Sequence, residues 1–304
     1  MKVIALAPSR ISLFGGGTDV YSDASRFGGL CLNMAINLRH RIELSTSGED
    51  DVEPFDNPKF YKRLIGREVH LSHRYDNTIE SGLGSSAGFA VALVGAMAKL
   101  NGENPTPAEI AEKAWTREVH EIGMFGGRQD QYCIAYGGVN AMEFDSKEVK
   151  VTPLAKGYIA PLLPSLVLFN TGVTRKNTKI QEGLKELTDE QIKQLNIIKS
   201  IALDAIDPIA KGDYETVAGL MQEAWKAKKA SNRGVSNEEI DKIYQMGITA
   251  GAMAGKLLGS GGGGHILFVI EPATREKFIK EMEKKGLKWV DFSVDWNGVE
   301  TRTI

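Results

Sequence analysis

Cysteine is scarce in this sequence. The 304 residues include two cysteines, Cys31 and Cys133, which are far apart and have neither a CxxC spacing nor an adjacent histidine. A disulfide framework is therefore excluded, and the pattern gives no zinc site. The N-terminal segment, MKVIALAPSR, has too short an apolar run for a secretory signal. We expect two buried thiols in a reducing compartment and a cytoplasmic protein.

An excess of charge of one sign is also lacking. Lys and Arg number 37 and Asp and Glu 39, a net charge of -2, so we expect no nucleic acid and no acidic membrane as partner. A long hydrophobic run is missing as well. Residues 81–98 (SGLGSSAGFAVALVGAMA) carry no charge, but their first third is Gly and Ser, which leaves fewer than the roughly 20 apolar residues of a membrane span. We expect a buried helix that follows a phosphate-type loop.

The coarse pattern predicts mixed helix and strand in both halves of the chain, without an internal repeat. A proline-rich connection at residues 153–164 favours two α+β domains, 1–155 and 156–304, with the active site between them. Capping boxes at Thr106–Glu109 and Ser236–Glu239 predict two helix starts. The expected strands are residues 2–7, 30–36, 40–45, 139–144, 149–152, 166–170, 265–271 and 287–294, and the expected helices are 85–100, 106–122, 176–211, 214–230, 237–257 and 274–285.

Glycine, in contrast, is abundant. It accounts for 33 of 304 residues, about 11% against a usual 7% or so, and three clusters hold much of the excess. They are residues 14–19 (FGGGTD), 81–88 (SGLGSSAG) and 259–264 (GSGGGG). Glycine allows positive φ and lets backbone N–H groups approach a ligand closely. One such cluster is usually a turn, but three in one chain favour a phosphate site.

Known phosphate motifs narrow the choice among these clusters. No G-x-x-x-x-G-K-[ST] sequence is present, so a Walker A site is excluded. Residues 259–264 match G-x-G-x-x-G, but a helix is predicted before them and a strand after them, the reverse of the dinucleotide-binding order. In residues 82–88 the glycines precede Ser85 and Ser86 at a predicted helix start, where free N–H groups can receive phosphate oxygens. The alternative is that both serines are merely N-caps.

The three clusters together resemble one family. Residues 7–10 (APSR) through Thr18-Asp19 resemble its first motif, residues 82–87 (GLGSSA) its second and residues 258–264 (LGSGGGG) its third. The family is that of the GHMP kinases, small-molecule kinases named for galactokinase, homoserine kinase, mevalonate kinase and phosphomevalonate kinase. Arg10 with Asp19, and residues 126–132 (GGRQDQY) and 169–175 (FNTGVTR), are similar to its sugar-kinase branch, closest to D-glycero-D-manno-heptose 7-phosphate kinases and fucokinase-like enzymes.

This resemblance implies a two-domain α+β fold, with an N-terminal domain like domain 2 of ribosomal protein S5 and a ferredoxin-like C-terminal domain. It implies ATP and Mg²⁺ as cofactors. Asp130 would accept the proton of the substrate hydroxyl, and Arg10 would hold Asp130 ionised. Ser86 and Glu118 would hold Mg²⁺. The ATP phosphates would lie on the second motif, residues Gly82, Leu83, Gly84, Ser85, Ser86 and Ala87.

For the substrate, the resemblance implies a sugar or sugar phosphate. Asp19, with Gly16, Gly17 and Thr18, would bind sugar hydroxyls, although an Asp after three glycines is often a turn residue. If the sugar carries a phosphate, Arg128 and Arg175 are candidate partners, and for each of them a solvated surface charge is the alternative. The third cluster should pack beside the phosphate loop.

Three interpretations of the function remain open at this stage. The first is an ATP-dependent kinase of a sugar or sugar phosphate, heptose 7-phosphate-like or fucose- or galactose-like. The second is a mevalonate-type or amino-alcohol kinase of the same family, against which Arg10 and Asp19 argue. The third is a catalytically silent sensor of nucleotide and sugar. The combination of Ser86, Glu118 and Asp130 argues against a sensor, which would not need magnesium ligands. A homodimer is also compatible with the sequence.

Overall fold

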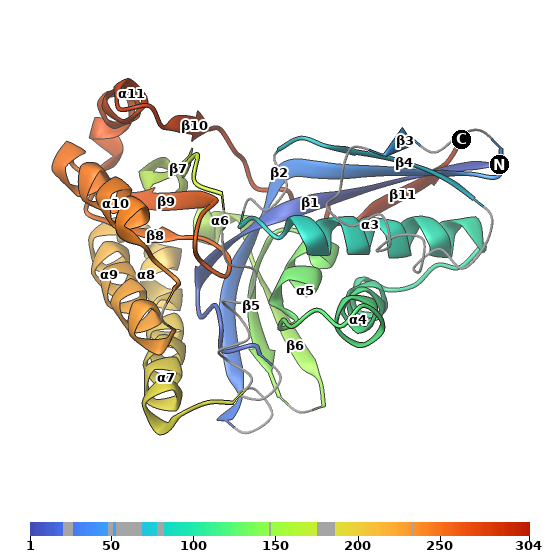
Figure 1. Cartoon of the computed structure of the whole chain (residues 1–304), viewed down its shortest axis with the longest axis horizontal. Helices are drawn as coiled ribbons and strands as arrows, with labels where there is room; N and C mark the ends of the chain where they lie inside the picture. The colour runs from blue at the N-terminus through green and yellow to red at the C-terminus, as the bar shows by residue number, and fades with distance from the viewer. Residues whose placement is uncertain are drawn as a thin grey trace.

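The computed structural model describes residues 1–20, 27–47, 51–52, 69–77, 82–145, 147–174, 186–232 and 234–304. In this part of the chain, the strands form two sheets, and helices pack against both (Figure 1). The first sheet has the order β11-β1-β2-β4-β3, with β5 on β2 and β6 on β5; the second has the order β10-β7-β9-β8. The fold is therefore α+β, as the sequence predicts.

The strands of the first sheet are β1 (Lys2–Phe14), β2 (Gly29–Ser45), β3 (Asp51–Val52), β4 (His70–Tyr75), β5 (Val139–Phe144), β6 (Val149–Leu154) and β11 (Glu300–Thr303). Those of the second are β7 (Leu166–Asn170), β8 (Ala254–Leu257), β9 (His265–Val269) and β10 (Lys288–Val290). The longer helices are α3 (Ser85–Leu100), α4 (Pro107–Thr116), α5 (Gln129–Tyr136), α7 (Asp189–Asp204), α9 (Tyr214–Ser231), α10 (Glu238–Ala250) and α11 (Arg275–Lys284). The shorter ones are η1 (Arg117–Glu121), α6 (Lys156–Ile159), η2 (Leu163–Ser165), α8 (Ile206–Lys211) and η4 (Pro272–Thr274). None of the described helices has the length and apolarity needed to cross a membrane.

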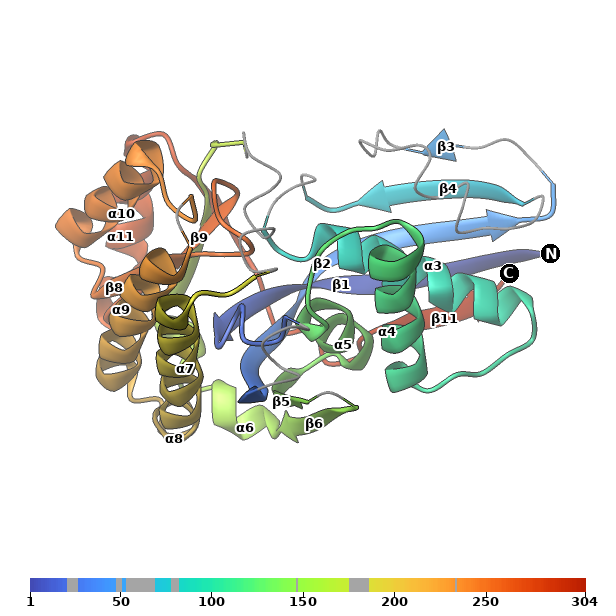
Figure 2. The same ribbon diagram turned by 60° about the horizontal axis from the view of Figure 1, so that its bottom comes forward.

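Most of the buried apolar side chains in the described part of the chain belong to three large cores. One core fills the space between the first sheet and helices α3, α4 and α5, which lie on the same face of that sheet (Figure 2). A second core joins the first sheet to α7, α8, α9 and the second sheet, with Leu13, Leu168 and Met221 among its members. The third lies between the second sheet and α10 and α11. Because the second core contains side chains from both halves, the two halves share one apolar core.

Several predicted element boundaries were wrong; β1, for example, runs to Phe14 rather than to residue 7. The sequence predicts separate strands at 30–36 and 40–45, but β2 is continuous. Residues 37 and 38 are accommodated by a register shift opposite Pro8 and Ser9 of β1. The helix predicted to reach residue 257 ends at Ala250, where Gly251 takes φ +112°, and β8 follows.

The two predicted helix caps had different outcomes. The capping box at Thr106 is confirmed, since its side chain accepts from the Glu109 N–H and Glu109 bonds back to the Thr106 backbone. The second was displaced by one residue. Asn237 rather than Ser236 caps α10, and it accepts from the Ile240 N–H at 2.9 Å.

The domain boundary between residues 155 and 156 lies in the connection from β6 to α6, and we keep it as a proposal. Within the predicted second domain, residues 156–304, the last strand returns to the first sheet, where β11 pairs with β1. Arg39 on β2 fixes this returning segment by bonding to Asp295 and Glu300, each at 2.5 Å. The two chain ends consequently lie side by side (Figure 1).

A buried histidine pair lies beneath α3. His40 and His73 are both fully buried, and His40 Nδ1 lies 3.1 Å from His73 Nε2. Gly88 of α3 rests on the His40 ring, because a Cβ there would lie 2.4 Å from His40 Cδ2. Burial lowers the pKa of His40 well below its ordinary value, and the neighbouring His73 adds to this effect. Burial also lowers the pKa of His73 to about 4, with a contribution from Arg74.

We expect this pair to make the protein acid-sensitive. In the unfolded chain a histidine has a pKa of about 6.5, so below pH 6.5 the unfolded state binds more protons than the folded state. The folded state therefore keeps its full stability above pH 6.5 and loses stability as the pH falls toward 4. For His73 alone, the free energy of unfolding should fall by roughly 2 kcal/mol at pH 5.

Urea unfolding at pH 8 and pH 5 measures this fall in the free energy of unfolding. His73→Gln should reduce it, whereas His120→Gln, at an exposed position, should not. An equal loss in both variants would contradict this explanation.

Candidate active site

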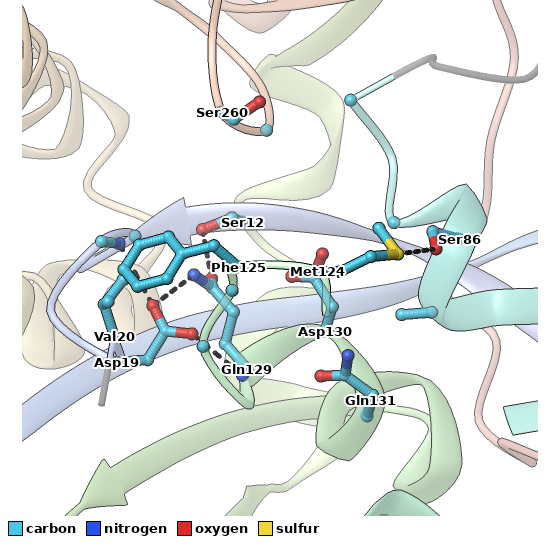
Figure 3. A pocket seen from close by; sticks show the side chains of 18 of the residues that line it. Ser12, Asp19, Val20, Ser86, Met124, Phe125, Gln129, Asp130, Gln131 and Ser260 are labelled. Carbon is cyan, nitrogen blue, oxygen red and sulfur yellow. Dashed lines mark hydrogen bonds between the residues drawn. The ribbon is translucent and has the colours of Figure 1, made fainter. Parts of the chain in front are cut away.

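A cavity of about 470 Å³ lies where the two halves meet. It is lined by β1, the loop before α3, η1, the segment before α5, the end of α9 and the loop after β8. Figure 3 shows its interior, with Ser260 across the cavity from Asp19 and Gln129. The charged side chains among the described residues of its wall are Arg10, Asp19, Glu118, Asp130 and Lys228. Four of these five were selected from the sequence.

The second glycine cluster forms the N-terminus of α3 at the edge of this cavity. Gly82 and Gly84 have φ of +73° and +76°, the left-handed conformation that glycine tolerates best. Gly84 is the N-cap residue and makes no side-chain cap bond, so Ser85 and Ser86 are not N-caps. The backbone N–H groups of the first turn therefore have no intrahelical acceptor, and they can receive an anion together with the positive end of the helix. Leu83, predicted in the same loop, lies instead in the core.

The third glycine cluster packs directly on the second, as expected. A Cβ on Gly82 would lie 2.6 Å from the Leu258 carbonyl oxygen, and one on Gly259 would lie 2.7 Å from the Gly82 Cα. Because no side chain fits between them, the two loops are in backbone contact. The loop after β8, in the second half of the chain, thus packs against the phosphate loop.

Arg10 and Asp130 form a bidentate ion pair on the cavity floor. Arg10 Nε and Nη2 donate to the two carboxylate oxygens of Asp130 at 2.7 and 2.6 Å, and Arg10 Nη1 donates to the Gly82 carbonyl at 2.6 Å. Burial opposes the charge on Arg10, but the charge and hydrogen bonds of Asp130 outweigh it, so its pKa is raised. Asp130, at the start of α5, is therefore held in one orientation, with its side chain about a quarter exposed to the cavity.

Asp19 is fixed by Gln129. Its Oδ1 accepts from Gln129 Nε2 at 2.7 Å and from the Gly17 N–H at 3.3 Å, and its Oδ2 accepts from the Gln129 N–H at 3.1 Å. Gln129 Oε1 in turn accepts from Ser12 (Figure 3) and from Asn33. Burial raises the Asp19 pKa, against the lowering effect of the bonds from Gln129 and Gly17. A carboxylate of this kind is prepared to accept a hydrogen bond from a bound hydroxyl group.

Glu118 contacts Ser86 on the opposite side of the cavity. The sequence predicts a single helix from residue 106 to 122, but the α-helix ends at Thr116 and a π-helical turn, η1, holds Glu118; such turns are common at functional sites. Glu118 accepts from Ser86 Oγ at 2.5 Å and from Gln131 Nε2 at 2.6 Å. Burial raises its pKa to about 7, although both hydrogen bonds oppose the rise.

The structure does not place three of the predicted site residues, Thr18, Arg128 and Arg175, in the cavity wall. Thr18 is fully buried and bonds to the Gly15 and Leu30 carbonyls, so it shapes the loop and lies outside the cavity wall. The guanidinium of Arg128 lies 4.2 Å from the centre of the Trp115 ring and pairs with Glu112 at 3.3 Å, also outside the wall. This position gives no support to its assignment to the substrate, which stays a prediction. Arg175 lies outside the described residues. Gly16 and Gly17 do line the cavity.

Sequence reasoning missed Gln129, Gln131 and Lys228. The two glutamines flank Asp130 and orient Asp19 and Glu118, a role that only tertiary contacts reveal. Lys228 did carry a signal. It follows the buried Val217, Met221 and Ala224 of α9 at the helical spacing of four, seven and eleven residues, and so lies on the inner face of the helix.

Models of one protein family match parts of both halves of the chain. The profile of the GHMP kinases N terminal domain matches residues 59–138, and that of the GHMP kinases C terminal domain matches residues 204–288. The chain is 32% identical over its full length, and that of its relative, to the D-glycero-alpha-D-manno-heptose 7-phosphate kinase of Campylobacter jejuni. It is 26% identical to the mevalonate kinase of Methanothermobacter thermautotrophicus, over 88% of this chain and 90% of that one. The crystal structure of a D-glycero-D-manno-heptose 1-phosphate kinase from Bacteroides thetaiotaomicron superposes with a TM-score of 0.80 at 27% identity, covering 99% of both chains.

These matches define the class of protein. The chain belongs to the GHMP kinase family, with the N- and C-terminal domains of that family in the expected order. The resemblance read from the three glycine clusters and the two-domain α+β fold is confirmed.

Gly127 must be a glycine for Asp19 to take its place. A Cβ on Gly127 would lie 1.9 Å from Asp19 Oδ2, whereas one on Gly126 would meet nothing within 4 Å. We therefore expect Gly127→Ala to lower the free energy of unfolding by about 1–3 kcal/mol, because the displaced Asp19 would lose its buried hydrogen bonds to Gln129. Urea unfolding measures the change, and Gly126→Ala is the matched control.

The pair Asp19→Ala and Gly127→Ala tests the cause. If the two residues interact as the structure has them, the double variant loses less stability than the two single variants together. Additive losses would mean that the Gly127 effect arises elsewhere.

Proposed function

We propose that this protein is an ATP-dependent kinase that transfers the γ-phosphate to a hydroxyl group of a sugar or sugar phosphate. The observation that carries the proposal is the position of the Arg10–Asp130 pair, which lies between the phosphate loop at Gly82 and the carboxylate of Asp19. Phosphoryl transfer needs alignment and charge neutralisation more than covalent help from the protein. The cavity has a candidate group for each of these tasks.

The acceptor hydroxyl belongs beside Asp130. Its carboxylate would orient the hydroxyl toward the phosphorus atom and accept its proton as the new P–O bond forms. Arg10 holds that carboxylate in one orientation through two hydrogen bonds. This role asks for position rather than strong basicity, because the hydroxyl loses its proton late in a loose transition state.

The nucleotide phosphates belong on the loop that runs from Gly82 to Ala87. Here the N–H groups of Ser85, Ser86 and Ala87 begin α3 without intrahelical acceptors. The apolar part of the cavity, which includes Val119, Ile122 and Val235, excludes water from the reacting groups.

Mg²⁺ fits the pair formed by Ser86 and Glu118. The described residues contain no cluster of three or more His, Cys, Asp or Glu side chains that could hold a metal by themselves, so a cation here takes its other ligands from phosphate oxygens and water, as Mg²⁺ often does. The raised pKa of the buried Glu118 identifies a carboxylate that a cation would stabilise. When bound, the ion neutralises charge on the phosphate oxygens.

The sugar belongs beside Asp19 and Gly17. A buried carboxylate with hydrogen bonds from Gln129 suits a hydroxyl-rich substrate, because a sugar hydroxyl can donate to its remaining acceptor sites. This favours the sugar over mevalonate as acceptor, and it is the reason for placing the mevalonate-type alternative second. The heptose phosphate kinases among the relatives support the same choice.

The direct test is ADP release from Mg-ATP with a panel of acceptors. The panel contains free hexoses, fucose, heptoses, their phosphates, mevalonate and homoserine. We expect turnover with sugars or sugar phosphates alone, and a loss of about 10²-fold or more in kcat for Asp130→Asn. Asp207→Asn, at an exposed ion pair on α8, is the matched control and should retain full activity. Turnover with mevalonate would overturn the sugar assignment, and nucleotide binding without turnover on any acceptor would favour a sensor.

The role of Glu118 gives a second prediction, on pH. Its carboxyl group has a raised pKa of about 7 before a cation binds, so protons compete with Mg²⁺ below pH 7. The Mg²⁺ concentration for half-maximal activity should rise about tenfold per pH unit below that point. Glu118→Gln should need more Mg²⁺ at every pH and should lack this pH dependence. A pH dependence that persists in the variant would assign the effect to another group.

A further inference from the structure

Lys228 approaches the cavity from the second half of the chain. It lies near the end of α9, is partly buried and lines the cavity. Its Nζ donates to the Gly259 carbonyl at 2.7 Å. An ammonium group has three N–H bonds, and Gly259 O uses one of them.

Gly259 is the residue that touches the phosphate loop. A Cβ on it would lie 2.7 Å from the Gly82 Cα, and Arg10 donates to the carbonyl of this same Gly82 at 2.6 Å. Lys228 and Arg10 are thus anchored to two glycines in backbone contact, one in each half of the chain. Their positive charges converge on the place where the phosphate loop meets the Arg10–Asp130 pair.

The charges of the cavity wall give Lys228 a specific task. The described lining residues include three carboxylates, Asp19, Glu118 and Asp130, and two cations, Arg10 and Lys228. Both carboxylate oxygens of Asp130 already accept from Arg10, so the charge of Arg10 is largely compensated. Lys228 is the described lining cation whose anchor is a neutral carbonyl, and its charge remains available to an anion.

We propose that Lys228 is a catalytic residue that donates a hydrogen bond to a non-bridging oxygen of the phosphoryl group in transit. The proposal rests on the kinase function proposed above. In the reaction the bond between the γ-phosphorus and the β–γ bridging oxygen breaks, and its electron pair stays on ADP. A bond forms between the phosphorus and the acceptor oxygen, whose proton passes to Asp130. Lys228 forms no covalent bond and neutralises charge on the transferring group.

The surroundings of Lys228 support a role that depends on pH. Burial lowers its pKa to about 8, the charge of Arg10 lowers it further, and the acidic groups of Asp130, Asp19 and Cys31 oppose the effect. The free enzyme should therefore lose the ammonium charge as the pH rises past about 8. Such a loss appears as an alkaline limb in kcat/KM for Mg-ATP.

The test compares Lys228→Met, Lys228→Arg and the control Lys226→Met, an exposed lysine on the same helix. Each is assayed with one free sugar and one sugar phosphate that the wild-type chain accepts. We expect Lys228→Met to lose about 10²- to 10³-fold in kcat, by the same factor with both acceptors. ADP affinity and thermal stability should stay within twofold and a few degrees of the wild type. Lys228→Arg should recover activity and lack the alkaline limb, because arginine stays protonated.

Each other outcome overturns the proposal in a distinguishable way. A loss confined to the sugar phosphate would assign Lys228 to the substrate's own phosphate group. Equal losses of ADP affinity and activity would make it a nucleotide-binding residue, and a loss of thermal stability in both Lys228 variants would make it structural. An active wild type with an unaffected Lys228→Met would refute this proposal alone, whereas an inactive wild type on every acceptor would refute the kinase function itself.

Discussion

The guanidinium of Arg10 connects the parts of the site that must keep a fixed distance. It donates to Asp130 at the start of α5 and to the carbonyl of Gly82. The backbone N–H of Arg10 also donates to the Leu83 carbonyl at 2.9 Å. One residue of β1 therefore sets the spacing between the phosphate loop and the group beside the acceptor hydroxyl. A register shift between Pro8 and Ser9 lies just before it, and a bulge of this kind redirects the side chains that follow. Removal of the Asp130 carboxylate would leave the buried Arg10 guanidinium without a compensating charge.

The second constraint is the fixed contact between the two halves of the chain. The apolar core that contains Leu13, Leu168 and Met221 is shared by both, and the Lys256 ammonium on β8 donates to the Ser12 and Leu13 carbonyls at 2.8 and 2.9 Å. Burial lowers the pKa of Lys256 well below its ordinary value. These contacts tie β8 to β1 beside the cavity, which Ser12 also lines. The glycine loops at Gly82 and Gly259 are therefore held in backbone contact. Lys228 of α9 reaches the same place through its hydrogen bond to the Gly259 carbonyl.

Much of this arrangement is predictable from the sequence, and the exceptions share a cause. The glycine clusters, the capping box at Thr106 and the buried α3 depend on local chemistry, and they lie where the sequence predicts them. The contacts of Arg10 with Asp130 and of Ser86 with Glu118 followed from a family resemblance that spans the chain. The π-helical turn at Glu118, the continuous β2 and the contacts of Gln129 depend on packing between distant segments. Propensity and periodicity carry no information about those contacts.

Arg128 shows what a motif position leaves open. Its place in the segment GGRQDQY suggested a substrate contact, yet its guanidinium lies over Trp115 and pairs with Glu112. A motif position fixes the backbone trace, whereas the direction of a long side chain depends on the partners around it. The neighbouring Gly127 is the informative residue of this segment, because its missing Cβ is what admits the Asp19 carboxylate.

The three carboxylates of the cavity show how one fold gives the same chemical group different properties. Asp130 is paired with a guanidinium, Asp19 is held by the amide and backbone of Gln129, and Glu118 is held by a hydroxyl and an amide. Burial raises the pKa of Asp19 and Glu118, and in both cases neutral donors supply the hydrogen bonds. Neutral donors leave the negative charge uncompensated, so each of these carboxylates favours an incoming donor or cation. The hydrogen-bond partner therefore decides what each carboxylate is suited to do. Asp130, paired with a cation, is suited to orient a hydroxyl group, whereas Asp19 and Glu118, held by neutral donors, are suited to bind a hydroxyl group or a cation.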